Sequence, residues 1–263
     1  GFDNILFHPN GKIHRLLTKL AFLNLLHPFQ PFILGQKNIG AKFAALYNIP
    51  LVFYGENEAE YGNPIKDNLT SMRDAKFATG ASYEEMYLGG VKVKELLEKY
   101  NLKLNDLLPF LPMDTQEYEK KGIQVHYLGY YEKWDPQEAY YFAVENAGFE
   151  ANNERTEGTY SKYNSIDDKT DPYHYFTTLI KFGIGRATYD AAQEIRNQKI
   201  TREEGVALVK KFDLEFPKKY FKEFLEYIDL TEKEFWKVVD KFRSPHLWEK
   251  VDNGWHLRYA VWM

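Results

Sequence analysis

The chain of 263 residues carries a net charge of −4 and contains no cysteine, which excludes disulfides and thiolate metal sites. The acidic balance argues against a nucleic-acid partner, because a duplex binder normally presents a basic face. The longest apolar stretch, residues 16–26, is interrupted by Thr18, Lys19 and Asn24, and it is shorter than the ~20 residues of a membrane helix. We therefore expect a globular cytoplasmic protein without a membrane span.

The first third of the chain has the pattern of an α/β layer. Apolar residues at helical spacing predict a helix over 12–26, and His27-Pro28 ends it because the residue before proline avoids the α region. Residues 31–34 are short and apolar and predict a strand. A second helix is predicted over 36–48.

The continuous apolar run 50–54 predicts a buried parallel strand after that helix. A helix followed by such a strand is typical of an α/β sheet. We therefore assign residues 1–65 to a partial Rossmann-like α/β domain and residues 66–150 to an insertion of short helices and strands. Within the insertion, Asp135-Pro136 predicts a helix start.

Residues 151–263 are predicted to form a largely helical, substrate-binding region. The longest helical pattern runs over 172–196. Thr201 and Thr231 each precede a glutamate by three residues, which is the sequence of a capping box at a helix start.

An acidic segment follows the predicted strand directly. In an extended chain Glu56, Glu58 and Glu60 point the same way, and open α/β sheets bind ligands beyond the carboxyl ends of their strands. We assign Glu56, Asn57 and Glu58 to catalysis, Glu60 and Tyr61 to substrate or nucleotide binding, and Glu56 with Glu58 to a metal ion. The alternative is a solvated acidic loop.

Residues 154–169 mix cations, tyrosines, hydroxyls and two adjacent acids. Such a loop can bind phosphate and sugar hydroxyls, and a polar linker is an equally good interpretation. We expect contact with the helix over 172–196 to order this loop. The candidate binding residues are Arg155, Tyr160, Lys162, Tyr163, Asp167 and Asp168.

The helical pattern over 172–196 places His174, Thr178, Lys181, Gly185 and Thr188 on one face. A polar face with a glycine is unusual for a buried helix and predicts a site, with Lys181 in catalysis and His174 and Arg186 in binding. A solvent-exposed face is the alternative, as is a simple ion pair of Arg186 with Asp190. Gln36 and Lys37 are further binding candidates, although surface helix positions explain them as well.

Several long stretches resemble the N-acetyl sugar amidotransferase family, whose members modify pseudaminic, legionaminic or diacetamido-uronic sugars of flagellin and O-antigen. They are HPNGKIHRLL, HPFQPFILGQKNIG, IPLVFYGENEAEYGN, VHYLGYYEKWDPQ, RTEGTYSKYNSIDDK, IKFGIGRATYDAAQEIR and ITREEGVALV. Their order is that of the family, and they span nearly the whole chain.

The resemblance implies a PP-loop ATP pyrophosphatase-like fold of the HUP type and an ATP- and Mg²⁺-dependent reaction. ATP activates the acetamido oxygen of a surface sugar, and ammonia displaces it to give an acetamidino group. The ammonia comes from glutamine through a separate glutaminase subunit.

The chain departs from that family in one motif, because the phosphate loop SGGxDS is absent from it. We therefore interpret the chain as the C-terminal portion of the enzyme, inactive alone, with Val52 and Phe53 exposed where further strands would pack. The alternative function is a non-catalytic sugar-binding module that docks the glutaminase.

Overall fold

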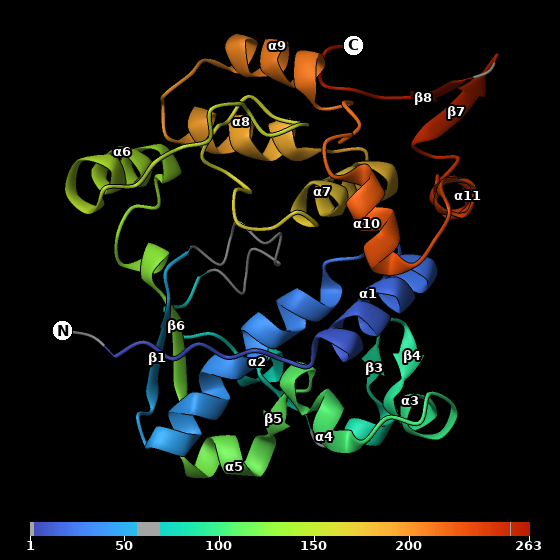
Figure 1. Ribbon diagram of the computed structural model, residues 1–263. Coiled ribbons are helices and arrows are strands. Elements are labelled where there is room, and N and C mark those ends of the chain that lie inside the picture. The colour runs from blue at the N-terminus through green and yellow to red at the C-terminus, as the bar shows by residue number, and fades with distance from the viewer. Residues whose placement is uncertain (1–2, 57–68, 81, 253) are drawn as a thin grey trace. The chain divides into compact units, whose positions relative to one another are not determined.

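The computed structural model describes residues 3–56, 69–80, 82–252 and 254–263. Its chain divides into two compact units (Figure 1). Unit 1 comprises Gly1–Asn24 and Gln30–Trp134, and unit 2 comprises Leu25–Phe29 and Asp135–Met263. The mixed α/β class with a largely helical C-terminal region is confirmed. The assignment of separate roles to 1–65, 66–150 and 151–263 stays a prediction.

Unit 1 combines helices with short strands and 3-10 turns. Its helices are α1 (Gly11–Leu25), α2 (Gln30–Tyr47), α3 (Val93–Lys99), α4 (Leu104–Leu107) and α5 (Thr115–Lys120). Its strands are β1 (Leu51–Tyr54), β2 (Thr79–Gly80), β3 (Tyr87–Leu88), β4 (Val91–Lys92), β5 (Met113–Asp114) and β6 (Gln124–Tyr127), and its 3-10 helices are η3 (Ala75–Phe77), η4 (Tyr83–Glu85), η5 (Leu108–Phe110) and η6 (Leu128–Tyr130).

The helix predicted over 12–26 is α1, and its apolar stripe enters a core. Ile13, Leu17 and Leu20 pack there with side chains from α3 and η5. The strand predicted over 31–34 is wrong, because these residues lie in α2. Pro31 fits there physically, since proline in the first helical turn removes an N–H that would have no intrahelical partner.

The strand predicted over 50–54 is β1, and it pairs in parallel with β6 (Figure 1). In this pair Phe53 lies opposite His126. Val52 and Tyr54 pack on the core that contains Ala41 and Ala44 of α2. The strand is not buried on both faces, however, because Leu51 and Phe53 on the opposite face are 49% and 51% exposed. The exposure predicted for Phe53 is therefore confirmed, whereas Val52 is half-buried.

Because its ring is half exposed, Phe53 contributes little to stability despite its apolar character. We expect Phe53→Ala to lower the free energy of unfolding by about 1 kcal/mol or less, measured by urea denaturation. Phe110, only 2% exposed, is the matched control, and Phe110→Ala costs several times more because it leaves a cavity. Equal losses for the two variants would contradict this account of the β1 face.

Unit 2 is built mainly of helices and ends in a hairpin. Its elements are α6 (Pro136–Ala147), α7 (Asp171–Phe182), α8 (Arg186–Arg196), α9 (Arg202–Phe212), α10 (Phe221–Ile228), α11 (Glu232–Lys241), β7 (Trp248–Val251) and β8 (Gly254–Leu257). The predicted helix start at Asp135 is confirmed, since its side chain accepts a hydrogen bond from the backbone N–H of Glu138. The capping boxes at Thr201 and Thr231 are also confirmed.

The single helix predicted over 172–196 is wrong, because α7 ends at Phe182 and α8 begins at Arg186. Gly183 lies in the left-handed region at φ 74° and closes α7. Gly185 precedes α8, and a side chain there would meet the backbone oxygen of Asp213 at 2.8 Å. The predicted face therefore divides, with Lys181 and Thr188 on different helices.

An aromatic cluster forms the core of unit 2. Tyr173 stacks on Phe224 with ring centroids 4.1 Å apart, and Phe216 meets Phe221 edge-on at 4.8 Å. Stacked and edge-to-face pairs stabilise a core beyond the apolar area they bury. Packing therefore accounts for the aromatic residues of this cluster.

The C-terminal hairpin β7–β8 is a feature that the helical prediction missed. The two strands pair antiparallel, with Trp248 opposite Leu257. The sequence between the two strands contains an Asn-Gly pair, and such a pair flanked by alternating hydrophobic residues is a hairpin signal. Separately, none of the helices in the described ranges is long and apolar enough to span a bilayer.

Candidate functional site

The predicted binding loop, residues 154–169, lies in unit 2 and contacts α8 as expected. The backbone N–H of Ala187 donates to the carbonyl of Gly158 at 3.0 Å. The Thr159 hydroxyl donates to the carboxylate of Asp190 at 2.5 Å, and Thr159 is fully buried. These contacts attach the loop to the first turns of α8.

Arg155 is held by a carboxylate from the segment after α9. Its guanidinium donates to both oxygens of Glu215, at 2.6 and 2.7 Å, and Glu215 also accepts from the N–H of Gly158 at 2.8 Å. The Arg155 guanidinium is the main reason that the pKa of Glu215 lies below its usual value. This geometry gives Arg155 a role in shaping the loop, and its predicted role in substrate binding stays a prediction.

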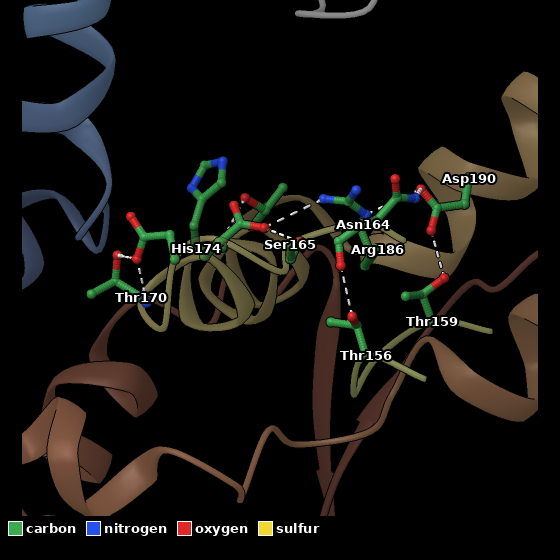
Figure 2. A network of polar contacts seen from close by, with 11 residues as sticks. Thr156, Thr159, Asn164, Ser165, Thr170, His174, Arg186 and Asp190 are labelled. Carbon is green, nitrogen blue, oxygen red and sulfur yellow. Dashed lines mark hydrogen bonds and ion pairs between the residues drawn. The ribbon is translucent and has the colours of Figure 1, made fainter. Parts of the chain in front are cut away.

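A second arginine lies at the centre of a polar network between α7 and α8 (Figure 2). Arg186 forms an ion pair with Asp190 at 3.1 Å and with Asp171 at 3.6 Å, and its side chain is only 13% exposed. Its guanidinium carbon lies 4.1 Å above the ring of Tyr175. The simple pairing of Arg186 with Asp190 is therefore present, extended by Asp171 and an aromatic face.

The two oxygens of Asp190 have separate partners (Figure 2). One accepts from Arg186 and from the amide of Asn164, at 3.1 and 3.3 Å, whereas the other accepts from Thr159. Asp171 accepts a hydrogen bond from the Ser165 hydroxyl. Burial raises the pKa of Asp171, and the Arg186 charge opposes that shift.

Asp213 organises the start of α8 from another part of the sequence. Its carboxylate accepts from the backbone N–H groups of Gly185 and Thr188, at 2.8 and 2.9 Å, and from the Thr188 hydroxyl at 2.8 Å. A carboxylate at this position satisfies the free N–H groups of a helix start and interacts favourably with the helix dipole.

A small polar pocket opens beside this network. It is lined by Asp135, Pro136, Gln137, Ser161, Tyr163, Asn164, Asp190, Gln193 and Glu194. Its volume is about 10 Å³, which is space for about one water molecule. The pocket therefore fits a single hydroxyl group of a ligand and not a whole ring.

Hydrogen-bond donors and acceptors both occur at this polar pocket. Burial raises the pKa of Tyr163 and of its neighbour Tyr160, so both hydroxyls stay protonated at neutral pH. Burial also raises the pKa of Glu194. The ring of Tyr163 stacks on Tyr140 of α6, with centroids 4.4 Å apart and planes within 9°. This stack holds one wall of the pocket in place.

His174 lies on α7 among aromatic rings. It stacks on His27 and Phe29, with centroids 5.1 and 5.2 Å away. Burial is the main cause that lowers the pKa of His174 from 6.5 to about 3, and the nearby cations add to it. The imidazole is therefore neutral at physiological pH.

Three other predicted residues of unit 2 have contacts that do not involve the polar pocket. The Lys181 amine donates to the carbonyl of Leu25 at 2.9 Å, and burial lowers its pKa. Lys162 donates to the carbonyl of Asn153 at 3.1 Å. Asp168 accepts twice from Thr170, whereas Asp167 is exposed.

The predicted residues of unit 1 lie on α2 and after β1. The carbonyls of Gln36 and Lys37 accept from the Tyr54 hydroxyl, at 2.9 and 3.1 Å. Half-buried Glu56 accepts through its carbonyl from the N–H of Gly129 at 3.1 Å.

The remaining predicted residues, Asn57, Glu58, Glu60 and Tyr61, lie outside the described residues. The structure therefore leaves the predicted Mg²⁺ pair, Glu56 with Glu58, untested. Within residues 3–56, 69–80, 82–252 and 254–263, no three His, Asp or Glu side chains are grouped as metal ligands.

Sequence reasoning missed several residues of this site. Glu194, Gln193, Asp213 and Glu215 were not predicted, and Asp190 was noted only as a partner of Arg186. Glu194 follows Asp190 by four residues, so their shared face on α8 was a usable signal. Asp213 and Glu215 offered no comparable signal, because each acts on residues at least 25 positions away in the chain.

Residues 157–261 match the family model described as LPS biosynthesis protein WbpG-like, C-terminal domain. The matched segment contains α7, α8 and most of the polar pocket. This match supports a role in sugar or lipopolysaccharide biosynthesis. No curated protein matches the chain.

Proposed function

We propose that this protein takes part in an ATP-dependent amidotransferase reaction, in which an acetamido group of a bacterial surface sugar becomes an acetamidino group. The polar pocket carries this proposal, because it lies mostly within the segment that matches a lipopolysaccharide biosynthesis domain. ATP, Mg²⁺ and a cytoplasmic glutaminase subunit that supplies ammonia belong to the same proposal.

The chemistry of the pocket suits sugar hydroxyls better than phosphate. Asp190 and Glu194 provide acceptors for hydroxyl protons, while the protonated hydroxyl of Tyr163 can donate. The nearby cation Arg186 is already bound to two carboxylates. A phosphate would therefore meet mainly acidic side chains there, whereas a neutral sugar can exchange hydrogen bonds with them.

The residues after β1 are proposed to act on the reacting group. Glu56 follows a parallel strand at its carboxyl end, where open α/β sheets bind ligands. Glu56 and Glu58 would hold Mg²⁺, which neutralises the charge of a leaving phosphate. Lys181 would act as a hydrogen-bond donor. Among the described residues its amine donates to the carbonyl of Leu25 and lies over the ring of Phe182, and an ammonium group has three N–H donors.

The test is an assay of the complete gene product with ATP, Mg²⁺, isotopically labelled ammonium and a candidate acetamido sugar. Mass spectrometry and NMR detect whether labelled nitrogen replaces the acetamido oxygen. We expect labelled amidine from the complete gene product. Unchanged sugar across a panel of acetamido sugars would contradict the proposed reaction.

Two variants examine the assigned residues within that assay. Glu56→Gln is expected to lower kcat sharply, and Glu132→Gln, on the exposed surface of the same unit, is its control. Tyr163→Phe keeps the stack on Tyr140 but removes the hydroxyl, so KM for the sugar should rise about fivefold. Tyr141→Phe, at a ring that is 54% exposed, is the control for that change.

The rival function is a non-catalytic sugar-binding module that docks a glutaminase. The absence of SGGxDS from the sequence favours it. Calorimetric titration separates the two functions. Binding of the sugar to the complete gene product, with neither ATP binding nor amidine formation, would support the rival.

A further inference from the structure

An apolar cavity of about 310 Å³ opens in unit 1, between α2 and the segment that contains α4 and η5. Phe7, Ile39, Phe43, Leu46, Leu108 and Pro109 form its apolar wall. The volume lies at the lower end of the range of small-molecule sites. The cavity shares no residue with the polar pocket of unit 2.

One cation, Lys42 of α2, interrupts this apolar wall. Its amine donates to the carbonyl of Leu108 and, at 2.6 Å, to the carbonyl of Leu111. One helical turn earlier, the buried amide of Asn38 donates to the carbonyl of Phe110 at 3.0 Å. These three contacts tie α2 to η5 and fix the position of the amine at the cavity.

The charge of Lys42 lacks a carboxylate partner among the residues that the structure describes. Burial lowers the pKa of Lys42 to about 8, and no acid in the described part of the chain offsets that effect. An ammonium group has three N–H donors, and two of them are bound to carbonyls. The third remains available to a ligand, and a half-buried cation without a countercharge among the described residues favours an anionic one.

We propose that this cavity binds a small organic carboxylate with an apolar body, and that the carboxylate pairs with the Lys42 amine. The apolar body would lie against Phe7, Phe43 and Leu46, which present aromatic and aliphatic surface. One free N–H suits one carboxylate oxygen. The exposed amide of Asn105, at the same cavity, can donate to the other oxygen.

Phenylbutyrate and its neutral analogue phenylbutanol are the probes, titrated into the chain and followed by calorimetry and NMR. We expect phenylbutyrate to bind with a dissociation constant of about a millimolar or tighter. It should bind at least about tenfold more tightly than phenylbutanol, because a charge-assisted hydrogen bond is lost with the alcohol. Equal affinities, or no detectable binding of the carboxylate, would overturn the proposal.

Two variants separate a binding role of Lys42 from a purely structural one. Lys42→Met should remove the preference for the carboxylate, while Lys120→Met, at an exposed position of α5, should leave it unchanged. Leu108→Glu keeps the carbonyl contact and places an internal carboxylate beside the amine. It should abolish phenylbutyrate binding, and retained binding in a folded Leu108→Glu protein would refute the pairing.

Discussion

Arg186→Met is expected to lower the free energy of unfolding by about 3–5 kcal/mol, because it removes the only cation paired with two buried carboxylates in the described part of the network. Asp171 and Asp190 would then lie close together without a countercharge. Methionine keeps an apolar contact with the ring of Tyr175, so most of the loss comes from charge. Urea denaturation at neutral pH measures it.

Acid should reduce this penalty. Burial raises the pKa of Asp171, and the Arg186 charge opposes that rise. Removing the Arg186 charge therefore raises the pKa of Asp171 above its value in the wild type, so that the carboxyl group protonates more readily in acid. The difference between wild type and Arg186→Met should therefore shrink as the pH falls. A difference that stays constant from neutral to acid pH would argue against charge as the cause.

Arg186→Lys and Arg202→Met provide the comparisons. Lysine keeps the charge but lacks the planar fork that binds Asp190 and stacks on Tyr175, so it should recover only part of the loss. Arg202 lies exposed in the first turn of α9, and Arg202→Met should change stability by about 0.5 kcal/mol or less.

Stability should also fall below pH 6.5 because of His174. Its folded-state pKa is lowered from 6.5 to about 3, so between these values the unfolded chain binds a proton that the folded chain does not. The stabilisation is complete above pH 6.5 and is lost as the pH falls toward 3. The loss attributable to His174 should reach about 2 kcal/mol by pH 5.

The measurement is urea denaturation of wild type and His174→Phe between pH 7.5 and pH 5. The variant keeps a ring against His27 and Phe29 but cannot titrate, so its stability should fall less over this range. The charged or titratable groups that face His174 are His27, Lys181 and Arg186, and all three remain in both proteins. His246→Phe, at an exposed position, should keep the wild-type pH dependence. Parallel curves for wild type and His174→Phe would contradict the lowered pKa.

Local signals of the sequence predicted much of the fold. The helix start at Asp135 and the capping boxes at Thr201 and Thr231 were correct, because each depends on a side chain and an N–H three residues apart. The helix α1 was predicted from apolar residues at helical spacing, and the strand β1 from a continuous apolar run. Both patterns can be seen in the sequence without knowledge of distant contacts. The composition of residues 154–169 predicted a binding loop, and its role in binding stays a prediction.

Long-range contacts decided the rest. The pattern over 172–196 is compatible with one helix. Acceptors from distant segments let α8 begin where it does: the carboxylate of Asp213, 28 residues after Gly185, and the carbonyl of Gly158. Likewise, the sequence offered Arg155 as a binding residue without a partner and Arg186 either as a binding residue or as a partner of Asp190. The tertiary structure binds Arg155 to Glu215 and adds Asp171 to the pair of Arg186 with Asp190. The sequence by itself determined where helices begin and which segments carry polar chemistry, because those depend on near neighbours. Only the tertiary structure decided which charges are neutralised and which, like that of Lys42, lie at a cavity without a carboxylate partner in the described residues, because that depends on groups distant in the chain.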